Sequence, residues 1–269
     1  MNHPRLRNLF SIAAAIAALC IPALFMAQNP KPAPQLAQKP AAAATSWQHG
    51  RYWTERDQQL MTDFGDLAHF READLKLGPP APGQDRVVFM GDSITQGWDL
   101  EKYFPGKPYI NRGISGQTST QMLLRFRQDV IDLKPKVVVI LAGTNDIAEN
   151  TGPMPLSQTE GDIVSMAQLA RANGIRVVLC SVLPSVRFPW HPQLKDPAPK
   201  IAAVNKWLKA YAAGHGYVYV DYYSAMKDAA GGLPPNLSRD GVHPLPAGFA
   251  VMTPLAQAGI EKALKQKGR

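Results

Sequence analysis

Short apolar runs alternate along the chain with longer segments in which apolar residues recur at helical spacing. Four runs rich in β-branched or aromatic residues predict buried strands at Val87–Met90, Val137–Leu141, Val177–Ser181 and Tyr217–Asp221. A fifth strand is expected near Tyr109–Asn111. The intervening segments predict helices over Gln121–Leu133, Thr159–Asn173 and Pro199–Ala213. This alternation predicts an α/β fold in which a five-stranded parallel sheet is covered by helices on both faces.

The segment upstream of the first strand has a helical pattern of its own. Apolar residues recur between Arg56 and Lys76 at positions Leu60, Met61, Phe64, Leu67 and Phe70. This spacing predicts one amphipathic helix that packs on the outside of the domain. A stretch rich in glycine and proline, residues 78–83, then breaks the chain before the first strand.

The N-terminal region has the composition of an export signal followed by a tether. Residues 1–27 begin with Arg5 and Arg7 and continue as an apolar run, which predicts a signal peptide and export to the periplasm or the medium. The alternative is an uncleaved membrane anchor formed by residues 9–27. Lipidation of Cys20 is less favoured, because Leu19 is larger than the small residue that processing usually requires. Residues 28–47 are rich in proline and alanine and predict an extended linker, which leaves 48–269 for the folded domain.

Charge, cysteine content and histidine spacing narrow the classes of function. The formal net charge of +8 becomes +6 without the two leader arginines, and the basic residues are dispersed, so no nucleic-acid partner is expected. Outside the leader Cys180 is the one cysteine, and its apolar strand favours a buried core thiol. His69, His191 and His215 lack the spacing of metal ligands, so no metal or other cofactor is expected.

Two polar loops contain the parts of a catalytic triad. Ser93 follows the first predicted strand, and Asp240 and His243 lie three residues apart near the end of the chain. A serine hydroxyl becomes a good nucleophile when an imidazole accepts its proton and a carboxylate orients that imidazole. Each loop alone is compatible with an ordinary turn. Together they suggest Ser93 as nucleophile, His243 as base and Asp240 as its orienting group.

Two segments between these loops supply hydrogen-bond donors for a negatively charged reaction intermediate. Gly113 and Gly116 flank a short polar loop, and glycine lets a backbone N–H approach a substrate closely; Gly116 is the better candidate. Asn145 follows the strand Val137–Leu141 and carries a neutral amide. Such donors stabilise the oxyanion that forms on an attacked carbonyl, typically by about 3 to 4 kcal/mol each.

Taken in order, these segments resemble the four sequence blocks of the SGNH hydrolases, also called GDSL-type lipases and esterases. The blocks read Gly91-Asp92-Ser93-Ile94, Gly113-Ile114-Ser115-Gly116-Gln117-Thr118, Gly143-Thr144-Asn145-Asp146 and Asp240-Gly241-Val242-His243. Ile94 stands where the family name has leucine, which is an apolar exchange. The Gly-x-Ser-x-Gly elbow of the α/β-hydrolases is absent, so a different fold is expected.

The resemblance implies a three-layer, flavodoxin-like α/β/α fold and a serine hydrolase that needs no cofactor. It implies Ser93 as the nucleophile, His243 as the base and Asp240 as its orienting carboxylate, with Asp92 as a loop residue outside the triad. It also implies three oxyanion donors, namely the N–H groups of Ser93 and Gly116 and the side-chain amide of Asn145.

The substrate and its pocket are less clearly marked. Arg187 and Trp190 lie in loop 184–199 and are candidates for a pocket wall, although an ordinary surface loop is as good an interpretation. Trp98 is a further candidate whose position also suits the core. Short-acyl esters, acetylated glycans and lysophospholipids all fit an exported enzyme without a recognisable lid. The alternative, a catalytically inactive glycan- or surface-binding module, has no need for an intact set of catalytic residues. Nothing in the sequence indicates the oligomeric state.

Overall fold

The computed structural model describes residues 55–266. The predicted leader (1–27), the predicted linker (28–47) and the first residues of the predicted domain lie outside the described residues, and their assignments stay predictions. Within residues 55–266, no helix is both long enough and apolar enough to cross a membrane.

Five parallel strands form one sheet in the order β2-β1-β3-β4-β5. They are β1 (Val87–Gly91), β2 (Tyr109–Gly113), β3 (Val137–Leu141), β4 (Arg176–Cys180) and β5 (Val218–Val220). The predicted five-stranded α/β fold is confirmed. In the observed register Gly91 lies beside both Gly113 and Leu141, so the three strands β1, β2 and β3 end at the same level.

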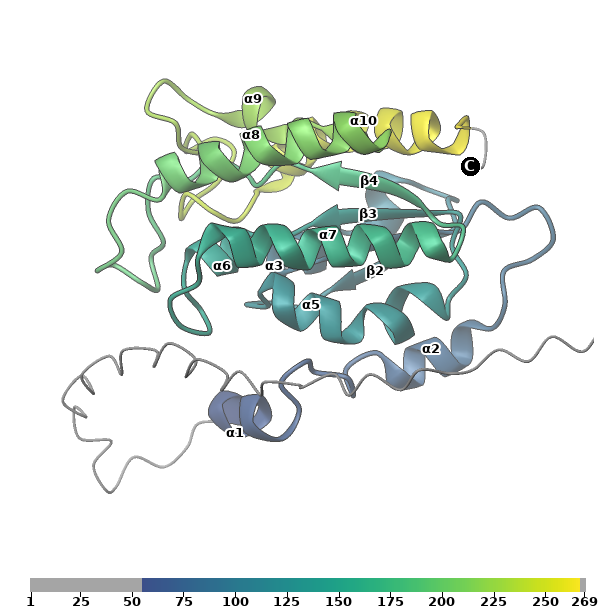
Figure 1. Cartoon of the computed structure of the whole chain (residues 1–269). Coiled ribbons are helices and arrows are strands. Elements are labelled where there is room, and N and C mark those ends of the chain that lie inside the picture. Colours follow the sequence, from purple (N-terminus) through teal and green to yellow (C-terminus); the bar gives the residue numbers. More distant parts are fainter. Residues whose placement is uncertain (1–54, 267–269) are drawn as a thin grey trace, which may run out of the picture. The chain divides into compact units, whose positions relative to one another are not determined.

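Helices cover both faces of this sheet (Figure 1). One face packs against α3 (Ser93–Gln96), α4 (Leu100–Tyr103), α9 (Tyr222–Met226) and α10 (Pro246–Leu264), and the other against α5 (Ser119–Phe126), α7 (Leu156–Ala172) and α8 (Ala198–His215). Val87 and Phe89 of β1 point into the first core, whereas Val88 and Met90 point into the second. Burial on both faces explains why the strands read as continuous apolar runs.

The upstream segment differs from the prediction of one helix. It forms α1 (Glu55–Thr62) and α2 (Arg71–Leu77), separated by a turn. The Asp63 carboxylate accepts hydrogen bonds from the N–H groups of Leu67 and Ala68, at 2.9 and 3.0 Å, and Asp66 has a positive φ of 54°. These side-chain-to-backbone bonds compete with helical ones and end the first helix.

A second difference concerns the segment after β2. The predicted helix Gln121–Leu133 is α5 followed by a π-helical turn, η1 (Arg127–Ile131). The buried side chains of Arg125 and Asp129 form an ion pair across this junction, with 2.8 Å between Arg125 Nη1 and Asp129 Oδ2. A mid-helix change of period of this kind has no clear signal in the apolar pattern.

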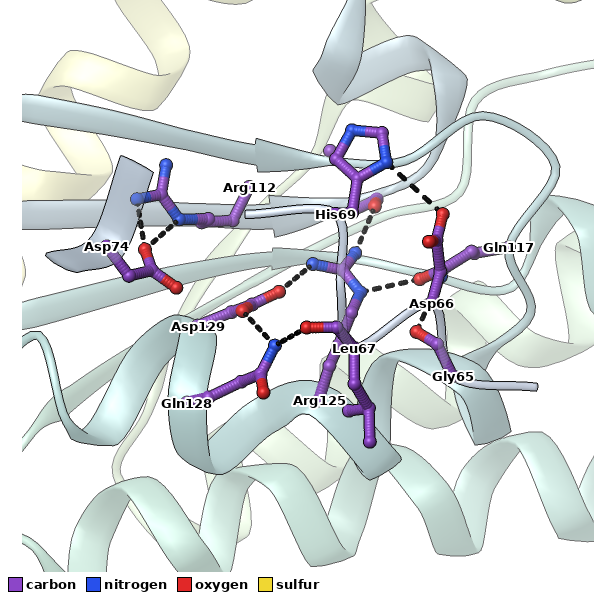
Figure 2. A network of polar contacts seen from close by, with 12 residues as sticks. Gly65, Asp66, Leu67, His69, Asp74, Arg112, Gln117, Arg125, Gln128 and Asp129 are labelled. Carbon is purple, nitrogen blue, oxygen red and sulfur yellow. Dashed lines mark hydrogen bonds and ion pairs between the residues drawn. The ribbon is translucent and has the colours of Figure 1, made fainter. Parts of the chain in front are cut away.

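Polar contacts fasten the α1–α2 segment to the rest of the domain (Figure 2). The side-chain amides of Gln117, Gln121 and Gln128 donate to the carbonyl oxygens of Gly65, Phe64 and Leu67, at 3.0, 2.7 and 2.7 Å. Arg112 forms an ion pair with Asp74 of α2. Three amide side chains and one ion pair therefore connect this segment to the rest of the domain.

Arg125 is the centre of this network. Its side chain is fully buried, and it donates to Gln117 Oε1 at 2.6 Å, to Asp129 Oδ2 at 2.8 Å and to the Gly91 carbonyl at 3.1 Å. Gly91 is the last residue of β1 and directly precedes Asp92 and Ser93. The buried network thus reaches the strand end that carries the candidate nucleophile.

Candidate active site

Ser93, Gly116 and Asn145 all follow strands that end at one edge of the sheet. Ser93 opens α3 after β1, Gly116 lies in the turn after β2, and Asn145 lies in α6 (Thr144–Ile147) after β3. Carboxyl ends of parallel strands are the usual place for binding and catalytic groups in open α/β sheets. The register therefore brings together three groups that lie more than 20 residues apart in the chain.

Two glycines allow α3 to lie tightly against the strand ends. A Cβ on Gly91 would stand 2.0 Å from Thr95 Oγ1, and one on Gly113 would stand 2.1 Å from the Gln96 backbone nitrogen. The first turn of α3 is closed by Asp92, whose Oδ1 accepts the Ile94 N–H at 2.9 Å. Ser93 is thereby placed at the start of a capped helix, half-buried at the edge of the sheet.

Ser93, His243 and Asp240 form one continuous chain of hydrogen bonds. Ser93 Oγ lies 2.9 Å from His243 Nε2, and His243 Nδ1 lies 2.6 Å from Asp240 Oδ2. With its Nδ1 proton directed at the carboxylate, His243 presents Nε2 to the serine hydroxyl as an acceptor. The arrangement has the geometry by which a serine is activated for attack.

The loop around Asp240 keeps its carboxylate charged. Burial alone would raise the pKa of Asp240, but hydrogen bonds from the His243 ring, from the N–H groups of His243 and Val242 and from the Ser238 hydroxyl hold it well below its usual value. Asp240 Oδ1 accepts both N–H groups at 2.9 Å and the Ser238 hydroxyl at 3.0 Å. The carboxylate and the imidazole are therefore fixed relative to each other by a single short loop.

The two other oxyanion candidates follow the strands on either side of β1, Gly116 after β2 and Asn145 after β3. Gly116 has a φ of +77°, a conformation that favours glycine. Asn145 is buried, and its Nδ2 donates to the Gln117 carbonyl at 3.0 Å and approaches Asp92 Oδ2 at 3.3 Å. These contacts direct one side of the Asn145 amino group to the Gln117 carbonyl after β2 and the other to Asp92 at the end of β1.

Two of the three candidate pocket residues lie beside the His243 loop. The ring of Trp190 is 5.8 Å from the His243 ring between centroids and is 43% exposed. Arg187 is exposed, and its Nε lies 4.0 Å from the position that a Cβ on Gly241 would take. A flat aromatic surface therefore borders the imidazole, and a cation lies near Gly241 in the same loop.

Trp98 is placed differently from these two residues. It is 2% exposed and packs against Phe89, Phe104, Tyr222 and Phe249, with ring centroids 5.6 to 6.3 Å apart. This position corrects the expectation that it borders the same cleft as Trp190. The alternative interpretation, a core aromatic residue, describes its surroundings.

Sequence reasoning missed the contributions of Asp92 and Asn150. Asp92 is completely buried, and burial raises its pKa to about 6, although the Ile94 N–H and the charge of His243 oppose the shift. Its place directly before a helix start is an N-cap signal that a reader of the sequence can find. Asn150 donates from Nδ2 to Asn145 Oδ1 at 2.8 Å and accepts the Trp190 indole N–H at 2.8 Å. No sequence signal marked it.

The remaining titratable groups do not suggest a metal site. Among the residues that the structure describes, no group of three His, Cys, Asp or Glu side chains is arranged to hold a metal ion. Cys180 is completely buried, and burial raises the pKa of its thiol to about 12. A thiol in that state is a poor nucleophile, so Cys180 serves the core.

Known proteins resemble this chain in sequence and in structure. The crystal structure of a GDSL-like lipase from Bacteroides thetaiotaomicron has a TM-score of 0.73 and 46% sequence identity, covering 75% of this chain and 100% of that one. Esterase TesA of Pseudomonas aeruginosa is 31% identical over 173 residues, which are 59% of this chain and 79% of that protein. An acetylxylan esterase of Xylanibacter ruminicola is 24% identical over 251 residues, 78% of this chain and 48% of that protein.

The chain spans about half the length of several curated relatives that it matches. The sequence profile of the GDSL-like Lipase/Acylhydrolase family matches residues 89–251, a range that contains every residue of the hydrogen-bonded Ser93–His243–Asp240 chain. The protein belongs to the GDSL-like lipase/acylhydrolase family.

Proposed function

We propose that the protein is a serine-dependent carboxylic ester hydrolase that works through an acyl-serine intermediate. The observation that carries this proposal is the unbroken hydrogen-bonded chain from Ser93 Oγ through His243 to Asp240, with contacts of 2.9 and 2.6 Å. Membership of a family that includes esterases supports it.

The first half of the reaction forms the acyl-serine. His243 Nε2 takes the hydroxyl proton while Ser93 Oγ bonds to the ester carbonyl carbon, and the carbonyl π electrons move onto the oxygen. When the tetrahedral intermediate collapses, the bond to the alcohol oxygen breaks and His243 gives its proton to the leaving alcohol. Asp240 stabilises the imidazolium between these two transfers and stays ionised throughout.

The second half removes the acyl group with water. His243 takes a proton from the water as the water oxygen bonds to the acyl carbon. When this second intermediate collapses, the bond between Ser93 Oγ and the acyl carbon breaks, His243 returns the proton to Ser93, and the carboxylic acid leaves. In both halves the donors to the negative oxygen are the N–H groups of Ser93 and Gly116 and one N–H of the Asn145 amide, which would leave its long 3.3 Å contact with Asp92 Oδ2 for the oxyanion. These donors belong to a largely buried frame, so little reorganisation accompanies the appearance of charge.

For the substrate we favour short acyl esters of a polar alcohol, with acetylated glycans as the first class to test. Trp190 presents an exposed ring beside His243, and a flat aromatic surface suits the apolar face of a sugar. Arg187, also exposed, would bind polar groups of the alcohol. The resemblance to an acetylxylan esterase supports this class. Lysophospholipids are the second class, because an exposed Trp and Arg also suit an ester with a phosphate in its headgroup.

We also propose that the enzyme acts after export. The charged and then apolar pattern of residues 1–27 supports a signal peptide, and residues 9–27 would serve as a membrane tether if the segment is retained. Fractionation of cells that express the full chain tests this: protein in the periplasm, medium or membrane fraction is expected, and protein confined to the cytosol would contradict export.

The proposed function is tested first with a ladder of p-nitrophenyl esters from acetyl to palmitoyl, comparing the protein with Ser93→Ala. Turnover that falls with acyl length and disappears in the variant is expected. A fluorophosphonate should add its mass at Ser93. Acetylated xylooligosaccharides and lysophosphatidylcholine then separate the two substrate classes. Equal or absent turnover in both proteins would favour the inactive binding module instead.

A further inference from the structure

We infer that Asn150 is a positioning residue for the reaction, which fixes the orientation of the Asn145 amide and is itself oriented by the indole N–H of Trp190. The inference rests on the proposed ester hydrolase function. It assigns to Asn150 no contact with the substrate. Its effect is transmitted through Asn145 and the loop of Gly116.

Asn150 lies between the two oxyanion candidates. Its Nδ2 donates to Asn145 Oδ1 at 2.8 Å and to the Gly116 carbonyl at 3.2 Å, and its backbone N–H donates to the Asn145 carbonyl at 3.0 Å. One half-buried side chain therefore joins the loop after β2 to the helix after β3. This bridge, together with the sheet, holds the loop after β2 at a fixed distance from the helix after β3.

The contacts of Asn145 are consistent with only one orientation of its amide. Its Oδ1 faces a donor on Asn150, and its Nδ2 faces two acceptors, the Gln117 carbonyl and Asp92 Oδ2. A rotation of 180° would set Nδ2 against the Asn150 amino group and Oδ1 against two oxygens. Without Asn150 the Oδ1 atom of this 2% exposed residue would have no protein donor among these contacts.

Trp190 in turn determines the orientation of Asn150. An indole N–H donates and never accepts, and Trp190 Nε1 lies 2.8 Å from Asn150 Oδ1. The Asn150 oxygen must therefore face the indole, which directs its amino group at Asn145 Oδ1 and the Gly116 carbonyl. The donor-to-acceptor direction of the hydrogen bonds from Trp190 through Asn150 to Asn145 is therefore set by the indole N–H, which can only donate.

Trp190 also borders the base of the proposed triad. Its ring centroid is 5.8 Å from that of His243, so the same side chain adjoins the imidazole directly and the oxyanion donors through Asn150. A substrate that packs on Trp190 would therefore contact a side chain that adjoins both His243 and, through Asn150, the oxyanion donors. This makes Trp190 a point at which binding of the alcohol part of the ester influences the rate of the acyl transfer.

The backbone supports the same interpretation. Glu149, directly before Asn150, has a φ of +58°, which is uncommon for a residue with a Cβ. This turn after α6 brings the Asn150 N–H back to the Asn145 carbonyl. A strained conformation at this point persists because the surrounding contacts hold it.

The test compares Asn150→Ala with the unchanged protein on p-nitrophenyl acetate. We expect kcat to fall by about tenfold to a hundredfold, below the loss for removal of an oxyanion donor itself, while KM changes by less than about twofold. Phenylboronic acid, which forms a tetrahedral adduct on an active serine, should bind more weakly by a factor similar to the loss in kcat. If Asn150 had only a structural role, its loss would lower the melting temperature, but kcat and the affinity for phenylboronic acid would not fall by similar factors.

Two further variants probe the orientation argument. Trp190→Phe keeps an aromatic ring but removes the indole N–H. It should lower kcat by a few-fold when Asn150 is intact and should not lower it further when Asn150 is already alanine. Asn150→Asp keeps the acceptor for Trp190 but places an oxygen against Asn145 Oδ1, so its loss should be at least that of alanine. Asn173→Ala is the matched control, because Asn173 donates one similar bond to the Leu169 carbonyl at the end of α7.

Each outcome is decisive. An active parent protein with unchanged kcat in Asn150→Ala overturns this inference and leaves the proposed function intact. If the fold-losses in kcat of Trp190→Phe and Asn150→Ala multiply in the double variant, the two residues act independently and the proposed coupling between them is overturned. A parent protein without esterase activity overturns the proposed function and this inference with it. If Asn150→Ala does not fold, the result of Trp190→Phe, whose side chain is 43% exposed, decides.

Discussion

The domain contains two close pairs of a basic residue and an aspartate whose surroundings are opposite. His243 and Asp240 lie 2.6 Å apart with side chains 40% and 39% exposed, whereas Arg125 and Asp129 lie 2.8 Å apart with side chains 0% exposed. A guanidinium never gives up its proton under ordinary conditions, and two buried charges are costly to separate. An imidazole near solvent can gain and lose a proton. A hydrogen-bonded pair of a basic residue and an aspartate can therefore take part in proton transfer near the surface, whereas in the interior it stabilises the fold.

The two pairs are connected through the ends of the strands. Arg125 donates to the Gly91 carbonyl, directly before Asp92 and Ser93, and to Gln117, whose own carbonyl accepts from Asn145. The buried pair therefore helps to hold the frame on which the proposed reactive pair acts. Changes in the two places should differ in kind: loss of rate at the surface, and loss of stability in the interior.

The largest effect is expected for His243→Ala. Without the base, Ser93 has no group within hydrogen-bond distance to accept its proton, so kcat should fall by about a million-fold, as for removal of a triad base elsewhere. The melting temperature should change little, because the side chain is partly exposed. Steady-state rates with p-nitrophenyl acetate and a thermal melt of the same sample measure both. A variant within tenfold of the parent rate would refute the role of His243.

Asp240→Asn should give the next largest loss. An amide at this position still accepts hydrogen bonds but no longer stabilises the imidazolium, so kcat should fall by up to about ten-thousand-fold while a measurable rate remains. Ser238→Ala is a suitable companion, since it removes one hydrogen bond to the Asp240 carboxylate, together with the acceptor for the Gly241 N–H, and leaves the carboxylate in place. If Asp240→Asn retained the full rate, the carboxylate would have no part in the reaction.

Arg125→Met tests the buried pair. It leaves Asp129 without its ion-pair partner in the interior and frees the acceptors on Gln117 and Gly91, so the free energy of unfolding should fall by about 3 to 5 kcal/mol. Urea denaturation measures the change. The double variant Arg125→Met/Asp129→Leu should recover part of the loss, because no lone buried charge remains. Equal stability of the single variant and the parent would mean that the pair does not contribute.

A smaller effect is expected from the buried carboxyl of Asp92. Its pKa is raised to about 6 by burial, so in the folded protein it keeps a proton that the unfolded chain loses near pH 4. Stability from this group therefore falls as the pH rises from about 4 to about 6, by about 1 to 3 kcal/mol. Asp92→Asn, which keeps an acceptor for the Ile94 N–H, should remove this dependence. Parallel stability curves for the two proteins would show that Asp92 does not titrate in this range.

Lys136→Gln should have the smallest effect. Lys136 Nζ and Asp85 Oδ1 are 2.6 Å apart, closer than the 2.8 Å of the buried Arg125–Asp129 pair, but the side chains are 44% and 52% exposed. Solvent and salt screen such a pair, so stability should change by at most about 1 kcal/mol, and less at high salt. A loss near that of Arg125→Met would show that the distance between the charges matters more than their burial.

The sequence alone carried the fold and most of the proposed site. Apolar runs such as Val137–Leu141 can only be buried on both faces, and this determines a parallel sheet and the loops at its carboxyl edge. The blocks around Ser93, Gly116, Asn145 and His243 lie in those loops, so their meeting was predictable from order alone. The signal at Asp92 was present as an N-cap and was interpreted too modestly as a loop.

Other features were decided only by the tertiary structure. Trp98 belongs to the core because Phe89 and Phe249 surround it, and Asn150 acquires its importance from Trp190, a residue 40 positions away. The predicted helix before β1 is broken by the carboxylate of Asp63. Apolar periodicity records which residues are buried, but the direction of a hydrogen bond depends on which donors and acceptors meet. That meeting is set by packing between distant segments, and no local pattern in the sequence contains it.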